Sequence, residues 1–108
     1  SEIMLLSPIN NSLIKIPKFI FNSRLPETSS YTLSITDISG NKISVKLNQT
    51  NYIRNGNKIE ANLISSINLS QLANGRYEWN VEGKLNNTIY YSNIDSFTKI
   101  ERVINETQ

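Results

Sequence analysis

The stretch YEWNVE, residues 77–82, carries a large apolar side chain at every second position and a polar or charged one in between. Because the side chains of a β-strand point alternately to its two faces, this period indicates a strand with one buried and one solvated face. The same alternation occurs in YTLSIT, residues 31–36, and in KISVKL, residues 42–47. Phe19 and Phe21 repeat the spacing further upstream, so strands are predicted to dominate the chain.

Segments rich in turn-forming residues separate these runs. Asp37–Asn41 reads DISGN and joins two of the predicted strands, and Asn55–Asn57 reads NGN, a second strong turn signal. Such short connections favour hairpins and therefore antiparallel pairing. Pro17 precedes the two phenylalanines. Since proline cannot donate to a ladder, it is expected in an edge strand or at the first residue of a strand.

The segment Lys58–Leu72 permits two interpretations. Every fourth residue from Ile59 to Ile67 is apolar, as in a helix. The same segment fits two short strands, 59–63 and 67–69, with a break at Ser65-Ser66. Strands are preferred because every neighbouring element is a strand and a lone helix would need a face to cover, but the helix stays open.

A chain of 108 residues has the usual size of one domain. About seven short strands with turns at regular spacing predict an all-β fold, an antiparallel two-sheet β-sandwich, over residues 1–100. A final strand is expected between Tyr90 and Ile100, and residues 101–108 are expected to form a polar linker or tail. The side chains predicted for the core are Phe19, Phe21, Tyr31, Leu33, Leu72, Tyr77, Trp79, Val81 and Phe97.

The composition argues against catalysis. The sequence contains no His and no Cys, which removes the most common general base, the thiol nucleophile and the usual ligands of metal sites. The nine carboxylates are scattered along the chain rather than clustered. The chain is therefore predicted not to be an enzyme and to bind no cofactor or metal ion.

Charge and hydropathy argue against two classes of partner. The net charge is +2, and the 11 basic residues form no run and no strip interleaved with aromatic residues, so no nucleic-acid partner is expected. No stretch approaches the length of a membrane span, so this segment is not expected to insert into a membrane.

The segment LANGRYEWNV, Leu72–Val81, resembles the passage between two consecutive strands in fibronectin type III-like modules of prokaryotic surface and secreted proteins. Tyr77 resembles their tyrosine-corner residue, whose hydroxyl bonds to nearby backbone. Leu6–Pro8 together with Pro17–Phe21 is similar to the first two strands, and Ser96–Ile100 is similar to the last.

The resemblance implies a fibronectin type III-like or immunoglobulin-like sandwich in an extracellular or cell-surface location. It implies a non-catalytic spacer or domain-positioning module, with neighbouring domains of the same polypeptide or another surface protein as partners. The Arg-Gly-Asp loop of adhesive modules is absent, so adhesion is not implied. Two other functions stay open: a carbohydrate-binding accessory module with a glycan as ligand, and a subunit that assembles filaments or surface layers by strand exchange.

Four aromatic residues are candidates for an interaction site. Trp79 invites stacking on a sugar, but its alternation with Tyr77 and Val81 favours the core. Tyr90 and Tyr91 are adjacent, so in a strand one of them must face away from the core, and Tyr52 lies near a predicted loop. An exposed tyrosine can stack on a sugar or anchor an interface, although single exposed aromatics are also common on sheet faces.

Oxygen-bearing side chains give two further patterns. Asp37, Asn41 and Asp95 have the chemistry of cation ligands but lack the spacing of a calcium loop, so turn formation is the preferred interpretation. Glycosylation acceptor triplets begin at Asn10, Asn48, Asn68, Asn86 and Asn105. Roughly three are expected by chance in a chain so rich in Asn, Ser and Thr, so the enrichment is weak.

The strand edges are the last candidate. Pro8, Pro17, Lys42 and Lys46 are of the types that blunt a free edge against pairing with another chain. They favour a module that is a monomer in isolation.

Overall fold

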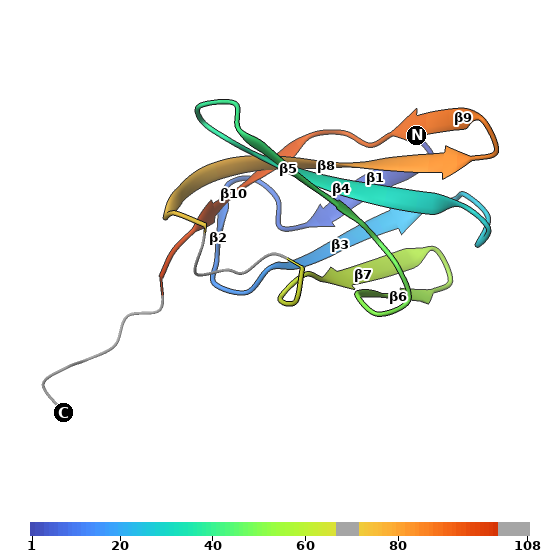
Figure 1. Ribbon diagram of the computed structural model, residues 1–108, viewed down its shortest axis with the longest axis horizontal. Coiled ribbons are helices and arrows are strands. Elements are labelled where there is room, and N and C mark those ends of the chain that lie inside the picture. Colours follow the sequence, from blue (N-terminus) through green and yellow to red (C-terminus); the bar gives the residue numbers. More distant parts are fainter. Residues whose placement is uncertain (67–71, 102–108) are drawn as a thin grey trace, which may run out of the picture.

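The computed structural model describes residues 1–66 and 72–101, which form ten strands (Figure 1). The described residues contain no helix that is long and apolar enough to cross a membrane. The strands are β1 (Ile3–Ser7), β2 (Ser12–Ile14), β3 (Lys18–Ser23), β4 (Ser30–Asp37), β5 (Lys42–Lys46), β6 (Tyr52–Asn55), β7 (Lys58–Asn62), β8 (Gly75–Leu85), β9 (Thr88–Tyr91) and β10 (Asp95–Lys99).

The strands form two sheets that pack face to face, which confirms the predicted all-β sandwich. One sheet has the order β1-β3-β7-β6 and the other the order β2-β10-β8-β4-β5, with β9 also paired to β8. The described pairs are antiparallel except for β2 and β10, which run parallel. The strand number exceeds the expected seven or so because β2, β6 and β9 have only three or four residues, too few to show an alternation in the sequence.

The stretch YEWNVE, residues 77–82, lies in β8, which at 11 residues is the longest strand of the described residues. Tyr77, Trp79 and Val81 point inward from it, while Glu78 and Asn80 point to the outer face. The strand pairs with β4 along one side and with β10 and then β9 along the other. Because the strand is this long, its row of inward-facing side chains extends from the part paired with β10 to the part paired with β9.

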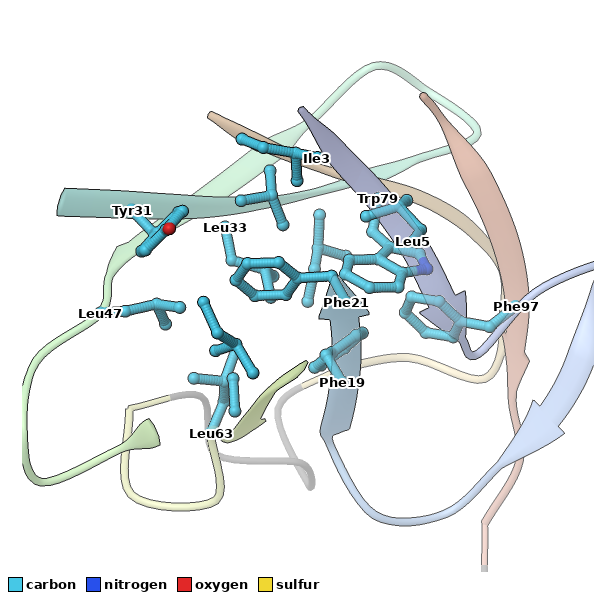
Figure 2. Close-up of a cluster of buried hydrophobic side chains, with 14 of the residues drawn as sticks. Ile3, Leu5, Phe19, Phe21, Tyr31, Leu33, Leu47, Leu63, Trp79 and Phe97 are labelled. Carbon is cyan, nitrogen blue, oxygen red and sulfur yellow. The ribbon is translucent and has the colours of Figure 1, made fainter. Parts of the chain in front are cut away.

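Aromatic rings fill the space between the sheets (Figure 2). Phe19 packs against Trp79 with ring centroids 4.9 Å apart and against Phe97 at 5.6 Å. Phe21 meets Tyr31 edge to face at 5.4 Å. All nine side chains predicted for the core lie in this buried cluster.

The ambiguous segment Lys58–Leu72 begins with a strand. β7 covers Lys58–Asn62, with Ile59 and Ala61 buried, so the helical alternative is wrong for these residues. The second expected strand, 67–69, lies outside the described residues. The predicted polar tail, 101–108, also lies outside them from residue 102 onward.

Pro17 lies at the start of a strand rather than at an edge. It is buried immediately before β3, and β3 lies between β1 and β7. Its carbonyl oxygen accepts a hydrogen bond from the backbone N–H of Leu63 at 2.9 Å. A proline at this point removes no ladder donor because the strand begins at the next residue.

Candidate functional site

The three candidate tyrosines do not gather on one surface. Tyr91 is 61% exposed in β9 and pairs with Glu82, whereas Tyr90 packs partly against the core opposite Gly83. Tyr52 is also half-buried against the core, but it lies in β6, at the edge of the other sheet. The adjacent tyrosines thus divide between the two faces as strand geometry requires, and the structure brings together no coplanar aromatic platform from the three.

Trp79 is a core residue. Only 1% of it is exposed, and its indole N–H donates to the carbonyl oxygen of Pro8 at 2.8 Å. This bond fixes the β1–β2 connection to the middle of β8. A buried and hydrogen-bonded indole has no free face for a sugar.

The Asp37 carboxylate organises the β4–β5 turn. One oxygen accepts from the backbone N–H groups of Ser39 (2.9 Å) and Asn41 (2.8 Å), and the other accepts from the Asn41 side-chain amide at 3.0 Å. These bonds, chiefly those from Asn41, lower the pKa of Asp37. The carboxylate is therefore committed to the turn.

The Asp95 carboxylate, at the start of β10, bonds to the connection between β1 and β2. Its Oδ1 accepts from the backbone N–H of Asn10 at 2.7 Å and of Ser96 at 2.8 Å. No three acidic side chains gather to hold a metal ion anywhere in residues 1–66 and 72–101. Asp37 thus forms a turn as expected, whereas Asp95 joins the start of β10 to the distant β1–β2 connection.

A shallow hollow lies where the ends of β4 and β8 meet. It has a volume of about 230 Å³ and is lined by Thr36–Ile38 and Arg76–Glu78. Burial and the nearby Asp37 carboxylate raise the pKa of Tyr77 there. Pockets for small molecules are typically about 300–1,000 Å³, and this hollow contains no nucleophile paired with a base.

Tyr77 makes the backbone bond expected of it. Its hydroxyl donates to the carbonyl oxygen of Ala73 at 2.6 Å, four residues upstream. The ring stacks on Phe97 with centroids 5.4 Å apart. The bond closes the turn that leads into β8.

Sequence reasoning missed a polar cluster around Arg54. The guanidinium donates to the carbonyl oxygens of Leu25 (2.6 Å), Ser23 (3.3 Å) and Gly56 (2.8 Å), and to the Tyr31 hydroxyl at 3.3 Å. Ser23 and Tyr31 share a further bond of 2.6 Å between their hydroxyl groups. The signal in the sequence was Arg54 itself, which falls on the inward side of a short strand two residues after Tyr52.

The edge of β1 is closed by side chains. The backbone N–H of Arg24 donates to Glu2 O, so the alternation of an antiparallel ladder turns the peptide groups of Ile3 and Leu5 away from β3. Ser1 Oγ donates to Ile3 O at 2.9 Å, and Leu5 N donates to Asn93 Oδ1 at 3.0 Å. Side chains thus occupy positions that an added strand would need.

No family model and no curated protein matches this sequence. Among solved structures, the chain is similar to CopC from Methylosinus trichosporium OB3b, with a TM-score of 0.56 and 14% sequence identity. The match covers 94% of this chain and 97% of that chain. An identity this low shows shared architecture and nothing finer, so the comparison supports a β-sandwich and no narrower family.

Proposed function

We propose that this chain is a non-catalytic structural module, a fibronectin type III-like or immunoglobulin-like β-sandwich that positions neighbouring domains of a larger extracellular or cell-surface protein. The observation that carries the proposal is the position of the first and last strands. The described chain enters and leaves the sandwich at opposite ends (Figure 1). Such a domain fits in line between two others.

Two glycines of β8 locate these ends. A Cβ at Gly83 would lie 2.7 Å from Ile3 Cδ1, so β1 begins beside this residue. Lys99, the last residue of β10, pairs with Gly75 at the other end of β8. At about 3.3 Å per residue, the intervening part of β8 spans roughly 26 Å.

The parallel pair suits a module that carries load. Asn11 N donates to Ser96 O, and Ile100 N donates to Ile14 O, each at 3.0 Å. Tension between the ends of the chain pulls β2 one way and β10 the other. Because the strands are parallel, these bonds are loaded together in shear rather than opened one at a time.

The side-chain chemistry supports a non-catalytic role. The carboxylates of Asp37 and Asp95 accept hydrogen bonds from backbone N–H groups, and the hollow beside Tyr77 is shallow. Tyr91 offers one aromatic surface rather than the several coplanar rings that a sugar-binding face uses. A positioning role requires none of these groups to react.

Single-molecule pulling on the chain held between two folded marker domains tests the proposal. Ile100→Pro removes the N–H that donates to Ile14 O in the parallel ladder, whereas Ser44→Pro places the same residue type in β5, away from the loaded pair. We expect Ile100→Pro to lower the unfolding force well beyond its effect on equilibrium stability, and Ser44→Pro to leave the force unchanged once stability is matched.

Equal forces for wild type and Ile100→Pro at matched stability would contradict the load-bearing role. Turnover of a glycoside or peptide by the purified folded chain would contradict the non-catalytic one.

A further inference from the structure

We propose that the free edge of β5 is a docking site for an extended acidic peptide segment of a partner protein, which adds to the sheet as a further strand. This inference goes beyond the positioning role, since a spacer functions with or without such a partner. It rests on the ladder register, on the contrast with the other edges, and on the charge of this edge.

The register turns three peptide groups of β5 outward. Asp37 N donates to Asn41 O and Leu47 N donates to Tyr31 O, which fixes the bonded pairs between β4 and β5 at the odd-numbered residues. The backbone groups of Lys42, Ser44 and Lys46 therefore face away from β4. They form a row of donors and acceptors at the end of the sheet, where no strand of the described chain pairs with them.

Both edges of the four-stranded sheet, β1 and β6, have an outward N–H group that is already hydrogen-bonded. At β1, Leu5 N donates to Asn93 Oδ1. At β6, Tyr52 N donates to Asn48 O at 3.3 Å. Among the described residues, no side chain makes a hydrogen bond to the outward peptide groups of β5.

The side chains of β5 define the sequence pattern of the partner. Lys42 and Lys46 project from the outer face at either end of the strand, with Ser44 between them. Ile43 is 42% exposed, and Val45 packs partly against the core, both on the inner side. Since neighbouring strands share the same pleat, an added strand would place acidic residues opposite the lysines and apolar residues beside Ile43 and Val45.

Charge decides between a partner segment and a second copy of the chain. Two β5 edges pairing antiparallel would place Lys42 of each copy opposite Lys46 of the other, and like charges directly opposite are destabilising. The same two lysines attract an acidic segment. The edge therefore resists self-pairing while accepting a complementary strand.

The test uses two capped synthetic heptapeptides, one alternating glutamate with valine and one alternating lysine with valine, titrated into the full chain. Binding is measured by calorimetry and mapped by amide chemical shifts in NMR spectra. We expect the acidic peptide to bind, to shift the amides of β5, and to lose affinity as salt is raised. The basic peptide should bind at least about tenfold more weakly.

Two substitutions at one position isolate the edge. Ser44→Pro removes an outward N–H together with the hydroxyl and keeps the backbone ladder to β4, and we expect it to weaken binding of the acidic peptide by about tenfold or more. Ser44→Ala removes only the hydroxyl, which bonds to Ser34 Oγ at 2.9 Å, and should bind as wild type does. A joint Lys42→Glu, Lys46→Glu change should reverse the preference between the two peptides.

The proposal is overturned if the acidic peptide does not bind, if it binds no better than the basic one, or if Ser44→Pro binds as tightly as Ser44→Ala. Ile100→Pro should bind the acidic peptide normally while unfolding at lower force. The binding experiment can therefore contradict the docking site without contradicting the load-bearing role, and the pulling experiment can do the reverse.

Discussion

At the residue scale, the hydrogen bonds that matter most join a single side chain to backbone a short distance away. Tyr77 is 8% exposed and closes the turn before β8 with one hydroxyl, and Asp37 closes the β4–β5 turn with one carboxylate. Both residues stand at the hollow between the ends of β4 and β8, yet both serve the turns around it. Their removal should therefore appear in stability rather than in any activity.

Tyr77→Phe should destabilise the fold by about 1 kcal/mol, because it deletes the bond to Ala73 and leaves the ring stacked on Phe97. Urea denaturation followed by Trp79 fluorescence measures the change. Tyr90→Phe, at a half-buried position in β9, is the matched control and should stay within about 0.5 kcal/mol of wild type. Equal effects of the two variants would mean that the Tyr77 hydroxyl contributes nothing particular to the turn.

Asp37→Asn should flatten the acid limb of the stability curve. The pKa of Asp37 lies below its ordinary value of 3.8 in the folded state, chiefly because Asn41, and then Ser39, donate hydrogen bonds to the carboxylate. A lowered pKa contributes stability that is present above the unfolded value and is lost as the pH falls through the folded one. Urea titrations at pH values on both sides of 3.8 measure this loss. An unchanged profile in Asp37→Asn would contradict the assignment.

At the element scale, the short hairpin of β6 and β7 is attached to the rest of the molecule through Arg54. Gly56, with φ of +63°, begins the tight turn of this hairpin, a conformation that glycine adopts without strain. Arg54 then reaches across to the backbone that follows β3. The planar guanidinium donates to one carbonyl of its own hairpin, at Gly56, and to two carbonyls of the segment after β3, at Ser23 and Leu25.

Arg54→Lys should cost about 1–3 kcal/mol, since an ammonium group cannot reproduce the fork of donors and leaves half-buried carbonyl groups without partners. Denaturation measures the total, and hydrogen exchange should show the loss concentrated in β6 and β7. Arg76→Lys is the control, because Arg76 is half exposed and lies 3.9 Å from Glu78 in a surface ion pair. That change should stay within about 0.5 kcal/mol; a similar cost at both positions would contradict a special role for Arg54.

At the scale of the whole molecule, the edge strands β1 and β5 differ in whether side chains bond to their outward backbone groups. At β1, the side chains of Ser1 and Asn93 bond to outward backbone groups. At β5, the outward backbone groups pair with no described strand, and two lysines flank them. Lys42 and Lys46 lie on this edge strand, and we expect their charges to oppose pairing with a second copy. Of the two positions expected for Pro17, an edge or a strand start, it takes the second, immediately before the inner strand β3, so it blunts no edge.

Asn93→Ala should open the edge of β1 and promote self-association. The backbone N–H of Leu5 would lose its acceptor, and the exposed side chains of Met4 and Leu6 lie on the same strand. Sedimentation velocity over a range of concentrations should show association in the variant but not in wild type. Asn87→Ala, in the exposed turn between β8 and β9, should behave as wild type, and association of both variants alike would contradict the capping role.

Sequence patterns were sufficient to predict the all-β class, the inward-facing side chains of β8 and the burial of Trp79. These follow from a period of two, which is a local property of the chain and states directly which side chains share a face. The resemblance of Tyr77 to a tyrosine-corner residue also predicted that its hydroxyl bonds to nearby backbone, and the acceptor, Ala73 O, is four residues away.

Three features are visible only in the folded chain: the parallel pairing of β2 with β10, the contacts of Arg54, and the hydrogen bond from Leu5 N to Asn93. Each of these joins residues far apart in the chain; Leu5 and Asn93 are separated by 88 positions. Local alternation shows which face a residue occupies but not which strand lies beside it. That choice is made only when distant segments pack against one core.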